Sequence, residues 1–311
     1  MSKYPQTAAA CIAKFIDDIT IDPNKDAIGE FLTKNTVETY EANIKIVVRH
    51  LEESGRETLP HKITEDDIRY LLGVKWVGYA IRTRKTFKAV LSRYCAHFGN
   101  PVVKKVKIRF PHDMRPNVRR LNDEQANTLW RHPMNPLQRL VIMLTLFMGL
   151  RRTEVLRLKI DCVKYNSPTI MLMVNGKGGL GGKPRLVPLK PKMIEIINAY
   201  IEHRNELIAA VLKKNPNATI PDSLIVYKLS SQIREYGESG LDGAVCEKLS
   251  ETVGFKFSNH DLRRTLAQKL YRKGAELRTI ADILGHETIA DTEKYIGIVA
   301  DKMADAIEDA E

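Results

Sequence analysis

The sequence predicts a mainly α-helical fold with a small antiparallel β-sheet, arranged as an all-helical N-terminal domain followed by an α+β domain. Apolar residues recur at helical spacing through the first hundred residues, and a basic stretch with three prolines and no periodicity follows. Further on, two strand-like runs flank a glycine-rich turn. A chain of 311 residues also exceeds the usual size of one hydrophobic core. We therefore expect domains at residues 1–100 and 121–311, joined by a basic linker at 101–120.

The first domain should contain four or five helices, three of which have clear signals. Residues 35–54 place apolar side chains on one helical face, with Asn35 or Thr36 as the N-cap: Val37, Tyr40, Ile44, Val47 and Leu51. Thr64 stands three residues before Asp67, the spacing of a capping box. Residues 85–99 carry a second apolar face, and Gly99-Asn100-Pro101 ends that helix: Phe87, Val90, Leu91, Tyr94 and Phe98.

The second domain should begin near Leu121, where Asn122 can cap a helix. An apolar helix is expected at 137–149, followed by short strands at 169–174 and 185–189. The glycine-rich segment between the strands has the character of a hairpin turn. From Pro191 to the end we expect helices, with a polar interruption at 213–223.

The net charge of +11 and the isoelectric point near 9.4 suggest a polyanionic partner. Residues 82–120, called the basic stretch below, hold 12 basic residues and a single acid, Asp113. A solvated helix usually mixes both signs, so we expect this stretch to contact nucleic acid. The residues expected to bind DNA are Arg82, Arg84, Lys85, Lys88, Lys104, Lys105, Lys107 and Arg109.

Other features narrow the class of protein. The four cysteines match no metal-ligand spacing, and we expect them to be buried free thiols: Cys11, Cys95, Cys162 and Cys246. The N-terminus lacks the long apolar core of a signal peptide, and the longest apolar run, 140–150, is too short to cross a bilayer. We expect a cytoplasmic protein with no metal, no cofactor and no membrane contact.

Two of the segments that could carry chemistry lie beside the apolar helix and in the hairpin. Arg151 follows the apolar run directly, and an arginine at the edge of a core usually has an acidic partner, here Glu154 three residues on. The alternative is that cations merely complement the end of a helix dipole. The glycine-rich hairpin does not fit a phosphate-binding loop, but Lys177 and Lys183 could reach a ligand from it. The alternative there is a plain hairpin turn.

Two further segments lie near the C-terminus. His260 and Arg263 are one turn apart at the start of a predicted helix and could hold an anion together. The alternative is a surface helix capped by Ser258 or Asn259, with its arginines in solvent. The last segment contains His286 and Tyr295, each of which alone would more often be a packing residue.

Taken in order, these segments resemble the tyrosine recombinase, or phage integrase, family. The matching motifs are Gly-Leu-Arg151-Arg-Thr-Glu154, Gly-Lys177-Gly after a strand, His260-Asp-Leu-Arg263, and Leu-Gly-His286 with Tyr295. The resemblance covers the second domain motif by motif, and the first domain only in its size, helicity and basic character. It implies a helical core-binding domain at 1–100 and a catalytic domain at 121–311.

The resemblance also implies an activity: cleavage and rejoining of duplex DNA through a 3′-phosphotyrosyl intermediate, by a tetramer on paired sites associated with the nucleoid. Tyr295 would be the nucleophile, and the surrounding cations would favour its phenolate. Arg151, Arg263, His260 and His286 would stabilise the phosphorane, and Lys177 would protonate the leaving 5′ oxygen. Glu154 would support them.

Two departures from the family pattern bear on these roles. Family members often carry two threonines shortly before the tyrosine, whereas here Asp291 takes the first place and Thr292 the second. The hairpin is also longer than is common, so Lys183 competes with Lys177 as the acid. Two rival functions remain at this point: a type IB topoisomerase-like enzyme, and a non-catalytic DNA-binding protein on the same scaffold.

Overall fold

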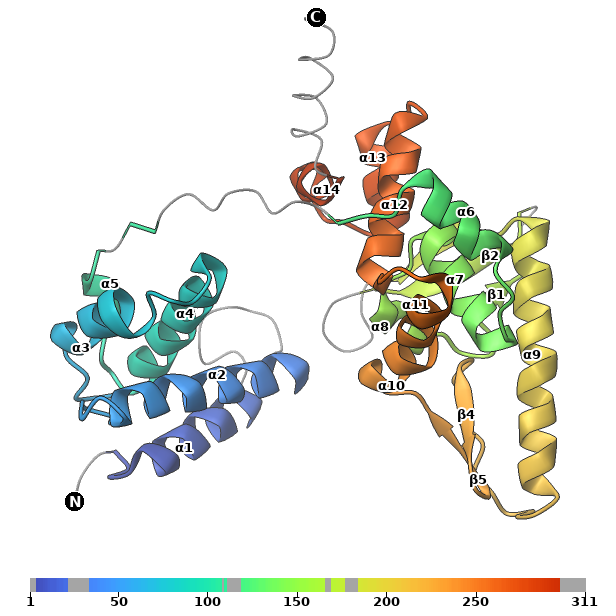
Figure 1. Ribbon diagram of the computed structural model, residues 1–311. Helices are drawn as coiled ribbons and strands as arrows, with labels where there is room; N and C mark the ends of the chain where they lie inside the picture. Colours follow the sequence, from blue (N-terminus) through green and yellow to red (C-terminus); the bar gives the residue numbers. More distant parts are fainter. Residues whose placement is uncertain are drawn as a thin grey trace, which may run out of the picture. The chain divides into compact units, whose positions relative to one another are not determined.

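The structure is a computed structural model that describes residues 4–21, 34–107, 109–110, 119–165, 169–176 and 184–296. These residues form two compact units, one before and one after the division at residues 116–117. Helices dominate both units, and the only strands among the described residues are short antiparallel ones in the second (Figure 1). The predicted fold class is therefore confirmed.

The first unit is all-helical in its described part. Its elements are α1 (Ala8–Ile21), α2 (Lys34–Glu52), α3 (Glu65–Tyr70), a π-helical turn (Leu71–Lys75), α4 (Ile81–His97) and α5 (Val102–Lys105). The apolar faces predicted for α2 and α4 form its core, in which Ile44, Leu51, Leu91 and Tyr94 are almost fully buried.

The termini of these helices test the capping predictions. Thr64 and Asp67 form the predicted capping box at the start of α3. The cap predicted for α2 was wrong, because the helix already includes Lys34, so Asn35 and Thr36 lie inside it. Helix α5 lies in the segment expected to be linker, and Val102 and Val103 pack in the core of the first unit.

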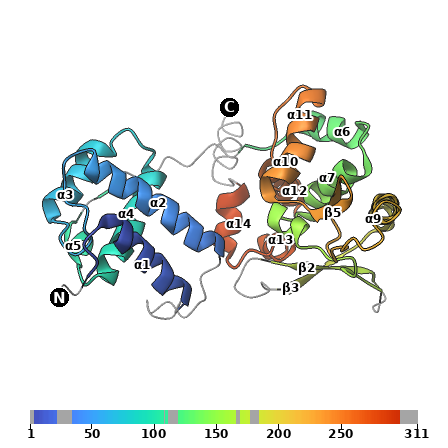
Figure 2. The ribbon, with the colours of Figure 1, turned by 90° about the horizontal axis from the view of Figure 1, so that it is seen from below.

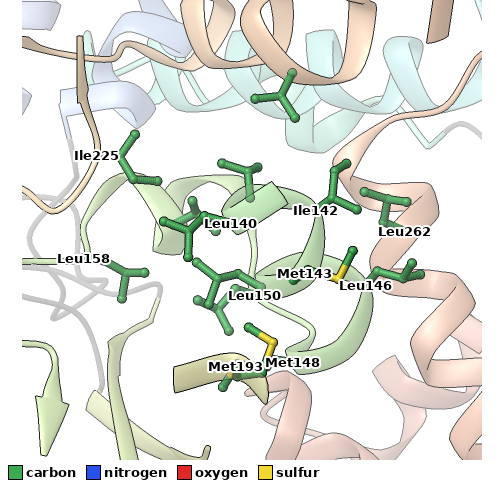
Figure 3. Packing of buried hydrophobic residues seen from close by; sticks show 14 of the residues in the cluster. Leu140, Ile142, Met143, Leu146, Met148, Leu150, Leu158, Met193, Ile225 and Leu262 are labelled. Atoms are coloured by element: carbon green, nitrogen blue, oxygen red, sulfur yellow. The ribbon is translucent and has the colours of Figure 1, made fainter. Parts of the chain in front are cut away.

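The second unit is built around α7 (Pro136–Met148), which packs against α9 and α12. Its other helices are α6 (Asp123–Arg131), α8 (Arg152–Leu156), α9 (Pro191–Leu212), α10 (Glu238–Asp242), α11 (Lys248–Val253), α12 (Asn259–Arg272), α13 (Leu277–Leu284) and α14 (Ile289–Ile296), with a π-helical turn at Gly243–Glu247. Leucine, isoleucine and methionine side chains from several of these elements interdigitate around α7 (Figure 3). The apolar run of α7 is thus a core helix, and no described helix is long and apolar enough to span a membrane.

A three-stranded antiparallel sheet lies beside this core, in the order β1 (Val163–Lys164), β2 (Met171–Asn175) and β3 (Pro184–Pro188). The register pairs Leu172 with Val187, and both side chains are buried. The two predicted strands are confirmed as β2 and β3. Figure 2 shows them edge-on, with the long helix α9 seen end-on beside the sheet.

One expectation for the second unit was wrong. Helices do not simply resume after Pro191, because β4 (Val226–Leu229) and β5 (Gln232–Glu235) form an antiparallel hairpin there. Its turn contains Ser230, whose φ of 53° is rare for residues other than glycine, asparagine and aspartate. The turn therefore lacks the Asn-Gly or Asp-Gly signal by which short hairpins are recognised in a sequence.

Candidate active site

The site begins where α7 ends. Gly149 takes the left-handed conformation, with φ 68°, and turns the chain so that Arg151 becomes the N-cap of α8. The Arg151 amide donates to Glu154 Oε2 at 2.7 Å, and its Nη1 donates to Glu154 Oε1 at 2.8 Å. Its Nη2 donates to the carbonyl oxygen of Gly285 at 3.1 Å. Glu154 is therefore the acidic partner that the sequence suggested for Arg151.

Glu154 is only 1% exposed and faces three guanidinium groups. Besides Arg151, Arg185 of β3 donates to both carboxylate oxygens, at 2.8 and 2.9 Å, and Arg263 Nη1 lies 3.8 Å from Oε2. Burial alone would raise the pKa of Glu154, but the hydrogen bonds and charge of Arg185, followed by the other arginines, lower it to about 2. The carboxylate is ionised at neutral pH and orders the arginines around it.

Arg263 projects from the first turns of α12, a helix capped by Ser258 through a reciprocal capping box with Asp261. Its side chain is 1% exposed and donates to the backbone carbonyls of Gly149 and Leu284. Burial, followed by the charge of Arg151, lowers the pKa of Arg263 to about 10, so it still carries its charge at neutral pH. The alternative that Arg263 lies in solvent was wrong, whereas Ser258 as cap is confirmed.

The histidine of the same motif differs from Arg263 in its surroundings. The side chain of His260 is exposed, while its backbone carbonyl accepts a hydrogen bond from the Tyr295 hydroxyl at 3.3 Å. Desolvation, followed by the charges of Arg264 and Arg263, lowers the pKa of His260 below its usual value. The ring is therefore neutral at pH 7 and free to accept a proton.

His286 follows the turn that ends α13, where Gly285 has φ 61°. Its Nδ1 lies 2.9 Å from the Oγ1 of Thr292, which is fully buried, so Nε2 is the ring nitrogen left to meet a ligand. Burial and the charges of Arg263 and Arg151 lower the pKa of His286 to about 4. His286 is therefore neutral at pH 7.

Tyr295 lies on α14 beside these groups. Its ring packs edge-on against His286, with centroids 5.1 Å apart, and the Arg263 and Arg264 guanidinium carbons lie 5.7 and 5.3 Å from its centroid. We expected these cations to favour the phenolate. In the DNA-free protein, however, burial raises the pKa of Tyr295 more than Arg263 and the other arginines lower it. The resting side chain is a neutral phenol, and a base must take its proton.

The structure thus brings together five of the six residues predicted to be catalytic: Arg151, His260, Arg263, His286 and Tyr295. The sixth, Lys177, and its competitor Lys183 lie outside the described residues. Only the flanking strands are described, down to the pair Asn175 and Pro184. The choice between the two lysines stays a prediction.

The residues predicted to bind DNA all lie in the first unit. Those with exposed side chains are Arg82, Lys85, Lys104, Lys105, Lys107 and Arg109. Arg84 has a structural contact, because its Nη2 donates to the Leu72 carbonyl at 2.6 Å. Arg84, Lys85 and Lys88 also lie over the ring of Phe110, at 5.7, 5.9 and 5.8 Å from its centroid. These cation–π contacts tie α4 to the segment around Phe110.

Sequence reasoning missed Arg185. The signal was present, because strand alternation in Pro184–Pro188 places Arg185 and Val187 on the same, inward face. An inward-facing arginine needs an anionic partner. The four cysteines are buried free thiols, as predicted. Among the described residues, no group of three or more histidine, cysteine or acidic side chains is placed to hold a metal ion.

Comparison with known proteins gives one family match, and residues 116–300 match the phage integrase family. The chain is 25% identical over 285 residues to the tyrosine recombinase XerA of Pyrococcus furiosus, covering 89% of this chain and 88% of that protein. It is 24% identical to the tyrosine recombinase XerC of Halalkalibacterium halodurans, covering 89% and 84%.

Two solved structures share the fold. One is the XerH site-specific recombinase bound to a palindromic difH substrate in a post-cleavage complex, with TM-score 0.63 and 18% identity, covering 94% of this chain and 81% of that one. The other is a lambda integrase dimer bound to a COC′ core site, with TM-score 0.62 and 15% identity, covering 93% and 94%. These similarities extend across both units of the chain.

Proposed function

The chain belongs to the phage integrase family of tyrosine recombinases, enzymes that transfer DNA strands, and we propose that it does so through a covalent bond between Tyr295 and a 3′-phosphate. Its substrate is DNA. The observation that carries the proposal is the arrangement at Tyr295: two arginines anchored by backbone carbonyls, two neutral histidines and the phenol meet at one place. A protein that only bound DNA would have no use for a phenol held in this setting.

The proposed chemistry follows from the charge that develops on phosphorus. Attack by Tyr295 Oη on a phosphodiester gives a phosphorane with more negative charge than the substrate, and Arg151 and Arg263 offer guanidinium groups for its non-bridging oxygens. Both are already oriented by Glu154 and by the carbonyls of Gly149 and Gly285. The site therefore needs little reorganisation when the phosphorane forms.

Proton transfers complete the step. His260, neutral and exposed, would take the phenolic proton as the bond from Tyr295 Oη to phosphorus forms. His286 would donate a hydrogen bond from Nε2 to a phosphoryl oxygen, because Thr292 occupies Nδ1. As the bond from phosphorus to the 5′ oxygen breaks, Lys177 would give that oxygen a proton. Attack by a 5′ hydroxyl on the phosphotyrosine reverses the steps and rejoins the strand.

The exposed cations of the first unit would hold the duplex near this site through its phosphates. We further propose that two DNA sites and four protomers form the active assembly and exchange strands in pairs. The titles of the XerH and lambda integrase structures, which describe DNA complexes, support the DNA part of this proposal. The DNA substrate would place the protein at the nucleoid.

The experiment that tests this function first needs the site. DNA trapped covalently on the protein and then sequenced would identify it, and a plasmid carrying two copies would then serve as substrate. We expect recombinant products that join flanking sequences of the two copies. Relaxation of the plasmid without recombinant products would favour the topoisomerase-like alternative, and binding without either reaction would favour the non-catalytic one.

A further inference from the structure

Glu154 poses an electrostatic problem at the proposed site. It is a buried carboxylate that touches Arg151 and lies close to Arg263, the two residues that would bind the scissile phosphate. A negative charge at that position repels the phosphate and competes with it for the same guanidinium groups. The arginines can bind a second anion only if another cation satisfies the carboxylate.

Arg185 is placed to satisfy it. Two of its nitrogens donate to both Glu154 oxygens, whereas Arg151 reaches one oxygen with its side chain and Arg263 makes only the 3.8 Å contact. Bidentate pairing of this kind is the strongest and most directional form of arginine–carboxylate contact. Arg185 therefore takes the largest share of the interactions of Glu154.

The position of Arg185 is fixed from its other side as well. Its Nε donates to the carbonyl of Ile283 at 3.2 Å, and a Cβ on Gly285 would lie 2.9 Å from Arg185 Nη1. The glycine thus leaves the space that the guanidinium fills. In this way Arg185 connects β3, the buried Glu154, and the turn that presents His286.

We propose that Arg185 is a positioning residue that balances the charge of Glu154, so that Arg151 and Arg263 remain available to the scissile phosphate. This inference rests on the proposed function. Three guanidinium groups and one carboxylate leave the cluster with a net charge of +2. Removing Arg185 alone leaves +1, whereas removing the charges of Arg185 and Glu154 together restores +2.

The test compares Arg185→Gln, Glu154→Gln, Arg185→Lys and the double variant Arg185→Gln/Glu154→Gln. For each, the rate of covalent complex formation is measured on a nicked substrate that traps the intermediate, beside the affinity for uncleaved DNA. Arg185→Gln should slow cleavage by about 10- to 100-fold, the range for groups that orient reactive residues, with little change in affinity. The double variant should cleave at least about fivefold faster than Arg185→Gln, because the two sites are coupled.

A merely structural role for Arg185 predicts the opposite order, since two buried substitutions then do more damage than one. Arg185→Lys, which keeps the charge but not the fork, should lie between wild type and Arg185→Gln. If Arg185→Gln alone does not fold, charge balance predicts that the double variant does. A double variant that fails to fold, or that cleaves no faster than Arg185→Gln, overturns the proposal.

A second measurement needs no DNA and separates this inference from the proposed function. Arg151, Arg185 and Arg263 are the charged side chains that face Glu154 among the described residues. With its pKa lowered from 4.5 to about 2, Glu154 stabilises the folded state above pH 4.5, and this stability is lost as the pH falls toward 2. Arg185→Gln should lose less stability over that range.

Equal acid dependence in wild type and Arg185→Gln would show that Arg185 does not hold the carboxylate ionised, and would overturn the inference even if cleavage were as proposed. If wild type forms no covalent complex on any DNA, the proposed function fails, while the acid-stability comparison still decides whether Arg185 balances Glu154.

Discussion

Substitution of Gly149 by alanine should damage both the core and the proposed active site. Gly149 has φ 68°, and a Cβ there would lie 2.8 Å from Leu284 Cδ2 and 3.1 Å from Leu266 Cδ2. Its carbonyl also accepts a hydrogen bond from Arg263. Any movement that relieves the contact with Leu284 therefore moves an anchor of Arg263.

The magnitude follows from two terms. A left-handed conformation costs a residue with a Cβ about 1–2 kcal/mol, of which about 0.4–1 kcal/mol is regained because alanine restricts the unfolded chain. Overpacking in a dense core adds about 1–3 kcal/mol. Gly149→Ala should therefore lower the free energy of unfolding of the second unit by about 2–4 kcal/mol.

Gly254 provides a matched control. It also ends a helix of the second unit, with φ 80°, but no described atom lies within 4 Å of the position a Cβ would take. Gly254→Ala should therefore cost about 1 kcal/mol or less, from the conformational term alone. Urea denaturation followed by tryptophan fluorescence measures both variants, with Trp130 in the second unit as reporter and Trp76 reporting the first unit equally in each protein.

The catalytic consequence can be measured separately. At a temperature where both variants are folded, Gly149→Ala should form the covalent DNA complex much more slowly than Gly254→Ala, because only Gly149 anchors Arg263. Equal stability losses in the two variants would refute the close-contact argument. A normal cleavage rate in folded Gly149→Ala would refute the role of its carbonyl in orienting Arg263.

Three more predictions address the leaving group, DNA binding and pH. Lys177→Ala should slow cleavage by orders of magnitude on ordinary DNA but much less on a substrate with a 5′-bridging sulfur, which leaves without a proton; equal defects on both would shift the role to Lys183. Neutralising Lys104, Lys105 and Lys107 together should lower the salt dependence of DNA binding by up to about three, at roughly 0.9 per phosphate contact, and an unchanged slope would mean that they make no such contact. Because the pKa of His286 falls from 6.5 to about 4 on folding, the protein should lose stability as the pH drops through that interval, and His286→Gln should flatten the loss; an equally steep loss in the variant would contradict the buried, neutral ring.

Local patterns predicted what local physics determines. The apolar faces of α2 and α4 follow from residue spacing, and the caps Thr64, Asn122 and Ser258 follow from side chains that satisfy free amides at helix starts. Strands β2 and β3 were visible as apolar runs beside glycines. The β4–β5 hairpin was missed because Ser230 takes the position where glycine or asparagine would have signalled a turn.

The candidate site could be predicted in membership more than in geometry. Helical spacing put His260 and Arg263 on one face, yet His260 is exposed and Arg263 buried, because Arg263 is held by carbonyls from two distant turns. Arg185 lies 31 residues from Glu154, and no local pattern indicates which basic residue will meet a buried carboxylate. The raised pKa of Tyr295 likewise depends on how deeply tertiary packing buries it.

The central claim is that Tyr295 forms a covalent bond with DNA, and peptide mapping of the trapped complex tests it most directly. Wild-type protein is incubated with its DNA site, digested with protease and nuclease, and the peptide carrying a nucleotide is identified by mass spectrometry. The account predicts a 3′-phosphonucleotide on Tyr295, and a Tyr295→Phe variant that still binds DNA but yields no adduct. An adduct on any other residue, or one that persists in Tyr295→Phe, would contradict it.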